Sequence, residues 1–178
     1  MDSRLRRWEA GGFLFTCLAG TLLHFVYDWS GKSALVGAFS AVNESTWEHM
    51  KLLFVPMFLA ALVEMAALGD CFRNFWTAKA AGTLAGLGLI PALYYTYTGI
   101  FGVSIMWVDI GIFYVAAAAG FLLETRLLLR QRQRGGALQL PAMLLMWALA
   151  LLFVFFTYYP PHIPLFQDPT TMLYGLGR

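Results

Sequence analysis

The sequence is poor in charged residues, because Asp, Glu, Lys and Arg make up only 12% of its 178 residues. An ordinary soluble domain has about 25% charged residues and about 45–50% apolar ones. Here hydrophobic residues make up 60%, and the mean hydropathy is +0.65. This balance excludes an ordinary soluble enzyme.

Cysteine is also scarce, with Cys17 in an apolar run and Cys71 in a short connection. The two have neither metal-ligand spacing nor the pattern of a disulfide framework, so we expect free thiols. A basic stripe is missing as well, since the net charge is +2 and Lys and Arg gather at the ends of apolar segments. The sequence therefore disfavours nucleic acid as a partner.

What the sequence does contain is long apolar segments, each able to cross about 30 Å of hydrocarbon as a helix. They cover about residues 11–29, 46–69, 76–98, 103–125 and 139–159. We predict an all-α, polytopic integral membrane protein in which residues 1–178 form one domain with five transmembrane helices. The expected location is the inner or plasma membrane.

The distribution of Lys and Arg predicts the orientation, because short loops rich in these residues stay cytoplasmic. An N-terminus inside the cell and a C-terminus outside place nine basic residues on the inner side and three on the outer side. The inner residues are Arg4, Arg6, Arg7, Arg73, Lys79, Arg126, Arg130, Arg132 and Arg134, and the outer ones are Lys32, Lys51 and Arg178.

Two connections are too apolar to be ordinary loops. Segment 30–45 and the proline-rich tail 160–178 both fall on the predicted outer side. We expect both to lie at the outer interface or to dip into the bundle, where protein can satisfy their backbone groups. The tail is expected to fold over the outer mouth of the bundle as a lid that carries His162. In the third segment, Gly82 and Gly86 permit close helix packing; we favour packing within the chain, although a homodimer is possible.

Ionisable residues concentrate in the outer layer of this topology. An unpaired ionisable group near hydrocarbon is costly, so we expect His24, His49 and Asp109 to share one polar cluster. Imidazole with carboxylate is the ligand set of Zn²⁺ and related divalent metals. We predict that His24, His49 and His162 hold zinc or another divalent metal, with Asp109 or Glu48 as general base. Supporting roles are assigned to Asp28, Asn43, Glu44, Trp47, Lys51 and Asp168.

Structural interpretations stand beside these functional ones. Ser45-x-x-Glu48 fits a capping box at the start of a helix. Trp47 fits the aromatic belt of a membrane interface. Glu64 and Glu124 lie near the predicted inner ends, where snorkelling or pairing with Lys79 or Arg126 would explain them.

One set of motifs resembles a known family. The motifs are His24-Phe25-x-Tyr27, Asn43-Glu44-Ser45-x-Trp47-Glu48-His49-x-Lys51, Pro160-Pro161-x-Ile163-Pro164-Leu165-Phe166 and Tyr174-Gly175. They resemble a family of small bacterial multi-pass membrane proteins of unknown function, which implies no activity. A weaker, purely chemical analogy is to the alkaline ceramidase and adiponectin receptor group of seven-helix zinc hydrolases; this sequence lacks their seven spans and their paired histidines on a late helix.

Three functions remain open from the sequence. The first is a metal-dependent hydrolase that acts on a lipid-like substrate or another small molecule at the outer face, with membrane lipids as its surroundings. The second is a small transporter or an ion or proton conduit that uses the same polar cluster. The third is a non-catalytic membrane scaffold.

Overall fold

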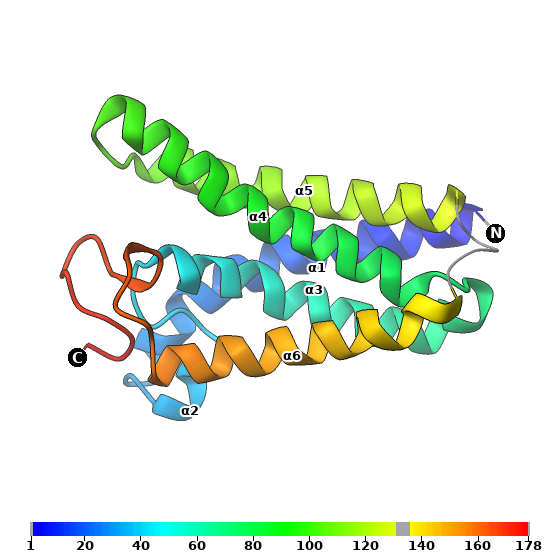
Figure 1. Cartoon of the computed structure of the whole chain (residues 1–178), viewed down its shortest axis with the longest axis horizontal. Helices are drawn as coiled ribbons and strands as arrows, with labels where there is room; N and C mark the ends of the chain where they lie inside the picture. Colours follow the sequence, from blue (N-terminus) through cyan, green and yellow to red (C-terminus); the bar gives the residue numbers. More distant parts are fainter. Residues whose placement is uncertain (1, 131–135, 178) are drawn as a thin grey trace.

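The protein is a bundle of five long helices, with no strand among the residues described (Figure 1). The structure is a computed structural model that describes residues 2–130 and 136–177. The long helices are α1 (Asp2–Trp29), α3 (Thr46–Leu68), α4 (Phe75–Phe101), α5 (Met106–Arg130) and α6 (Gln139–Tyr158). The short elements are α2 (Ala34–Gly37) and the 3-10 turns η1 (Gly69–Cys71), η2 (Gly136–Leu138) and η3 (Pro164–Phe166).

All five long helices are long and apolar enough to cross a membrane, so the predicted fold class is confirmed. The largest difference from the predicted bounds concerns α1, which begins at Asp2 and not near residue 11. The charged residues Arg4, Arg6, Arg7 and Glu9 lower the hydropathy there, but Arg and Glu are good helix formers. Glu9 is only 4% exposed, so this first part of α1 belongs to the bundle.

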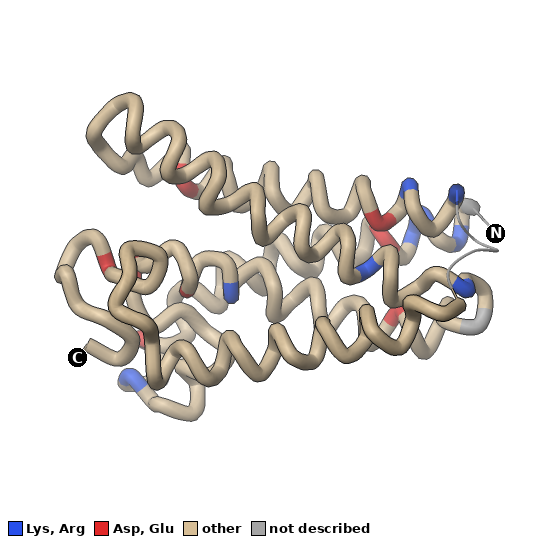
Figure 2. The backbone as a smooth tube through the Cα atoms, viewed as in Figure 1, with Lys and Arg blue, Asp and Glu red and all other residues tan. Residues whose placement is uncertain are grey.

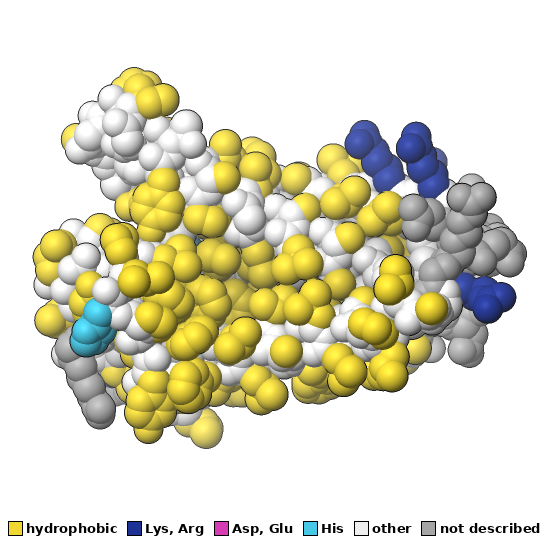
Figure 3. All heavy atoms as spheres, in the orientation of Figure 1, with side chains coloured by type: hydrophobic (Ala, Val, Ile, Leu, Met, Phe, Trp, Pro, Cys, Tyr) yellow, Lys and Arg dark blue, Asp and Glu magenta, His cyan; other side chains and the backbone are white. Residues whose placement is uncertain are grey.

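The surface of the bundle is apolar along its length. Figure 3 shows hydrophobic side chains over most of the visible face, with Lys and Arg side chains at one end. Large hydrophobic residues on every long helix are more than half exposed, among them Leu18, Val63, Ile100, Leu122 and Leu151. In water this exposure would be unfavourable, whereas acyl chains solvate such a surface.

The two ends of the bundle differ in charge (Figure 2). The arginine end holds the start of α1, η1 and the end of α5, and it carries Arg4, Arg6, Arg7, Arg73, Arg126 and Arg130. The tail end holds residues 30–45 and the C-terminal tail, residues 159–177. Arg132, Arg134 and Arg178, which also entered the charge comparison, lie outside the described residues.

Helices α4 and α5 form an antiparallel hairpin with a tight seam. A Cβ atom on Gly82 would lie 2.6 Å from the Gly120 carbonyl oxygen, and one on Gly86 would lie 3.0 Å from that of Ala116. Both glycines therefore pack against α5 of the same chain. The tip of the hairpin leans away from the tail (Figure 1).

The aromatic side chain of Phe166 packs the tail against α3 and α6. Its ring lies 4.8 Å from that of Trp47 and 5.3 Å from that of Phe156, centroid to centroid. The Asn43 amide also donates a hydrogen bond to the Gly175 carbonyl oxygen at 2.9 Å. These contacts hold the tail over the tail end of the bundle.

Candidate metal centre

Three side chains with metal-ligating atoms converge at the tail end. His24 comes from the last part of α1, Glu44 from the turn before α3, and His49 from the first turns of α3. One ligand atom from each of the three lies within 4.8 Å of the others. We call this group the His–Glu cluster.

The distances within the His–Glu cluster are short. Nε2 of His24 lies 3.7 Å from Glu44 Oε1, and Nε2 of His49 lies 3.6 Å from Glu44 Oε2. The two imidazole rings are 5.5 Å apart, centroid to centroid. The carboxylate of Glu44 therefore lies between the two imidazoles.

The turn before α3 sets the position of Glu44. The Asn43 side-chain oxygen accepts a hydrogen bond from the Ser45 amide at 2.9 Å, which closes a tight Asx turn around Glu44. Ser45 then caps α3, because its hydroxyl accepts a hydrogen bond from the Glu48 amide at 3.4 Å. Local sequence thus fixes the backbone on both sides of Glu44.

A backbone contact orients His49. Its Nδ1 lies 3.0 Å from the Ser45 carbonyl oxygen. A carbonyl can only accept, so Nδ1 donates the proton in this bond, and Nε2 is the ring nitrogen that faces Glu44. This is the arrangement that metal-bound histidines commonly have, with the second ring nitrogen bonded to a carbonyl or carboxylate.

The His–Glu cluster remains open to its surroundings. The side chains of His24, Glu44 and His49 are 30%, 48% and 33% exposed. Phe25 packs edge-on against His24 at 5.0 Å and stacks with Trp29, so apolar rings flank the cluster on α1. Asp28 is exposed one helical turn beyond His24. A ligand could approach this site from outside the bundle.

Glu48, predicted as a general base, lies in a different environment. It is 2% exposed and forms an ion pair with Lys51, whose Nζ lies 2.5 Å from Glu48 Oε2. Lys51 also donates to the Gly37 carbonyl oxygen at 2.8 Å and to the Thr157 hydroxyl at 2.7 Å. The Thr157 hydroxyl donates to Glu48 Oε1 at 3.0 Å. These contacts join α3 to α6 and to the end of α2, so Glu48 and Lys51 have a structural role.

The capping box is therefore half formed. Ser45 caps the Glu48 amide, but the Glu48 carboxylate accepts a hydrogen bond from the Val42 amide at 3.1 Å and not from the Ser45 amide.

Trp47 is 8% exposed, and the centroid of its ring lies 4.4 Å from that of Phe153. Trp47 therefore belongs to the aromatic core and not to an interfacial belt.

Asp109 lies in the α4–α5 hairpin, outside the His–Glu cluster. Its carboxylate accepts hydrogen bonds from the Tyr97 hydroxyl and, at 2.6 Å, from the Ser104 hydroxyl. These partners all belong to the hairpin, so they satisfy the carboxylate locally. The expectation that Asp109 shares a cluster with His24 and His49 does not match this placement.

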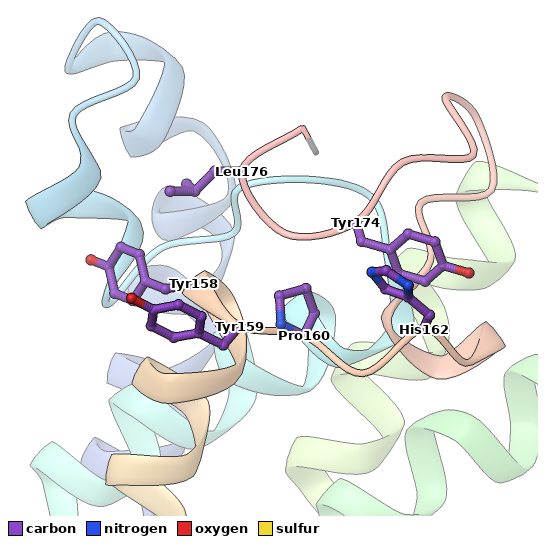
Figure 4. A pocket seen from close by; sticks show the side chains of 6 residues that line it. All are labelled: Tyr158, Tyr159, Pro160, His162, Tyr174 and Leu176. Carbon is purple, nitrogen blue, oxygen red and sulfur yellow. The ribbon is translucent and has the colours of Figure 1, made fainter.

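His162 also lies apart from the other two histidines. Its ring packs on Tyr174 with centroids 4.6 Å apart, and the side chain is exposed. Figure 4 shows this pair at the edge of a hollow of about 310 Å³, with Tyr158 and Tyr159 on the far side of Pro160. His162 is not part of the group of converging ligand atoms.

Asp168 has a local structural role in the tail. Its carboxylate accepts hydrogen bonds from the Thr170 hydroxyl and amide, at 2.6 and 2.7 Å, and from the Thr171 amide. Burial by itself would raise the pKa of Asp168, but the hydrogen bonds from Thr170 and Thr171 outweigh it and the pKa is lowered. Asp168 therefore remains ionised and closes the turn of the tail.

A second group of ionisable residues lies inside the bundle toward the arginine end. The Lys79 ammonium contacts the carboxylates of Glu9, Glu64 and Glu124. Pairing of Glu64 and Glu124 with Lys79 was one of the open interpretations, and the structure shows it. Sequence reasoning missed Glu9, because it precedes the predicted first helix. The signal that could have found it is Lys79, a cation within an apolar segment that needs counter-charges.

The fold defines the class of this protein as an all-helical, multi-pass membrane protein. Within that class, residues 1–176 match a family of unknown function (DUF6512), and the chain belongs to this family. No curated protein and no solved structure matches the chain.

Proposed function

We propose that this protein is a membrane-embedded zinc hydrolase whose metal site is formed by His24, Glu44 and His49. The observation that carries the proposal is the convergence of these three side chains from separate parts of the chain. It modifies the sequence-based ligand set, with Glu44 in the place of His162.

The chemistry of the ligands favours zinc. Two imidazoles and one carboxylate, with a fourth position for water, is a common ligand set of catalytic zinc. Ligands about 2.0–2.2 Å from a tetrahedral ion lie about 3.4 Å apart. The separations of 3.6 and 3.7 Å between the Glu44 oxygens and the two Nε2 atoms are close to that value. Small side-chain movements would suffice to bind the ion.

An open coordination position implies water activation. Bound zinc lowers the pKa of its water to about 7, which supplies hydroxide near neutral pH. Glu48 and Asp109 are held by other partners, so we assign neither as general base. Asp28, exposed one turn from His24, is the nearest acid on α1 to assist proton transfer.

The surroundings of the site favour an amphiphilic substrate. Phe25 is 46% exposed and Trp29 69% exposed beside His24, on a helix that also exposes Leu14, Leu18 and Leu22. Such rings hold an acyl chain while the hydrolysable bond reaches the metal. We therefore propose a lipid-like ester or amide as the substrate class.

The charge distribution supports a location in the inner or plasma membrane. The arginine end would face the cytoplasm, and the His–Glu cluster would then face outward. An ion conduit is less favoured. Among the described residues, the buried side chains of Lys51, Glu48 and Thr157 pair with one another. Along the helices between them and the carboxylates around Lys79, the buried polar side chains are Thr16 on α1 and Thr83 on α4. Two hydroxyl side chains are too few to line a polar path through the bundle.

The test is the zinc content of purified protein in detergent after exposure to Zn²⁺ and removal of excess metal. We expect about one zinc per chain in the wild type, and its loss in His24→Ala, His49→Ala and Glu44→Ala. His162→Ala is the matched control and should retain zinc. Absence of zinc from the wild type, or equal loss in His162→Ala, would contradict the proposed site.

Activity is measured separately with a chromogenic acyl ester in mixed micelles. Zinc-dependent hydrolysis that His49→Ala abolishes supports the hydrolase. A chain that binds zinc but hydrolyses no ester or amide probe would leave a structural zinc site, and the catalytic part of the proposal would be wrong.

A further inference from the structure

The ionisable group around Lys79 has an unusual composition, with three carboxylates around one ammonium. Lys79 Nζ lies 2.9 Å from Glu9 Oε1 and 2.6 Å from Glu124 Oε2, and it also contacts Glu64 Oε2. The four side chains come from α1, α3, α4 and α5. We call them the Lys79 cluster; α6, the remaining long helix, contributes no charged side chain.

The Lys79 cluster is sealed from solvent. Lys79, Glu64 and Glu124 are each 1% exposed, and Glu9 is 4% exposed. The rings of Phe75 and Phe121 lie over the ammonium at 5.8 and 5.6 Å. Each carboxylate is therefore in a medium that screens charge poorly.

The charge of the cluster does not balance. Three carboxylates against one ammonium leave a formal charge of −2 if every group is ionised. A buried net charge costs several kcal/mol per ion, and in practice such groups change their protonation state instead. Among the described residues, Lys79 is the cation that the ion pairs of all three carboxylates share.

A separate observation indicates that Glu64 carries part of this uncompensated negative charge. Its Oε1 is buried and has no hydrogen-bond partner. On α1 this oxygen lies beside Gly12, where a Cβ would be only 2.7 Å from it. The glycine makes room for the oxygen but offers it no donor. An ionised carboxylate oxygen in this position would be unsatisfied.

We propose that the Lys79 cluster is a proton-binding site that holds two protons on its carboxylates in the folded protein. Each proton is taken up from hydronium in the solvent, which becomes water, and forms an O–H bond on a carboxylate oxygen. Two such protons bring the cluster to neutrality. A metal cation does not fit, since the Lys79 ammonium already occupies the centre of the three carboxylates. A proton needs no additional space.

The first test is infrared spectroscopy of the full chain in lipid vesicles at neutral pH. The carbonyl stretch of a protonated carboxylic acid is separate from that of a carboxylate, so bound protons are directly visible. We expect this band in the wild type, a weaker band in Glu64→Gln and in Glu124→Gln, and its loss in the double variant. Glu44→Gln, which lies in the exposed His–Glu cluster, is the control and should leave the band unchanged.

The second test counts protons. When the wild type is unfolded in unbuffered detergent at pH 7, it should release two protons per chain more than the Glu64→Gln/Glu124→Gln variant. The variant should remain folded, because Glu9 and Lys79 alone form a neutral pair. Equal proton release, or no protonated carboxyl band in the wild type, would overturn the proposal. Neither result bears on zinc binding at the His–Glu cluster, so the two proposals fail separately.

Discussion

At the residue scale, the buried pair of Lys51 and Glu48 joins α3 to α6 through Thr157. Both side chains are almost fully buried, and Lys51 has three partners from three parts of the chain. Removal of one member of a buried ion pair leaves the other charge without compensation. The pair is therefore a sensitive position although it lies outside the His–Glu cluster.

We predict that Lys51→Met lowers the free energy of unfolding by about 3–5 kcal/mol. The measurement is the unfolding midpoint of the purified protein in detergent. The double variant Glu48→Gln/Lys51→Met removes both charges and should recover part of the loss. If Lys51→Met unfolds like the wild type, the pair does not stabilise the bundle.

Residue types in the sequence indicated part of the candidate site. His24 and His49 were predicted as ligands, because unpaired imidazoles near hydrocarbon need polar partners. Which acid would join them could not be predicted, since Glu44 and Glu48 lie four residues apart and either could face the histidines. The Asx turn at Asn43 directs Glu44 to the histidines, whereas Lys51 and Val42 hold Glu48 in the core.

At the scale of elements, the seam between α4 and α5 depends on backbone contact. Gly82 faces the Gly120 carbonyl oxygen and the Glu124 side chain, so its lack of a side chain serves both helix packing and the Lys79 cluster. Gly88, two turns further along α4, has no atom within 4 Å of its Cβ position. The two glycines therefore make a matched comparison.

We predict that Gly82→Ala destabilises the protein by about 1–3 kcal/mol, because the new methyl group must displace backbone or a buried glutamate. Gly88→Ala should be neutral or slightly stabilising, since Ala favours a helix by about 0.5–1 kcal/mol over Gly. Thermal unfolding in detergent measures both variants. Equal effects would show that α4 and α5 do not pack as described.

At the scale of the whole molecule, the asymmetry between the two ends predicts orientation. All six described arginines lie at the arginine end, while the His–Glu cluster and the tail lie at the other. Basic residues near helix ends remain on the cytoplasmic side. We therefore predict a cytoplasmic N-terminus and an external C-terminus.

Reporter fusions at the C-terminus measure this orientation. A reporter that is active only outside the cytoplasm should be active, and one that is active only inside should be silent. The reverse result would place the His–Glu cluster on the cytoplasmic side and would remove the basis for an outward-facing site.

The sequence by itself determined the class of the protein, the number of long helices and most of their bounds. Those properties depend on local quantities, namely the length and hydropathy of each segment. Only the tertiary structure decided which ionisable residues meet. Glu9 joins Lys79 across 70 residues, whereas Asp109 and His162 have partners near them and lie outside the His–Glu cluster. Long-range pairing depends on how helices rotate and pack, and many pairings satisfy the same buried charges, so hydropathy cannot choose among them.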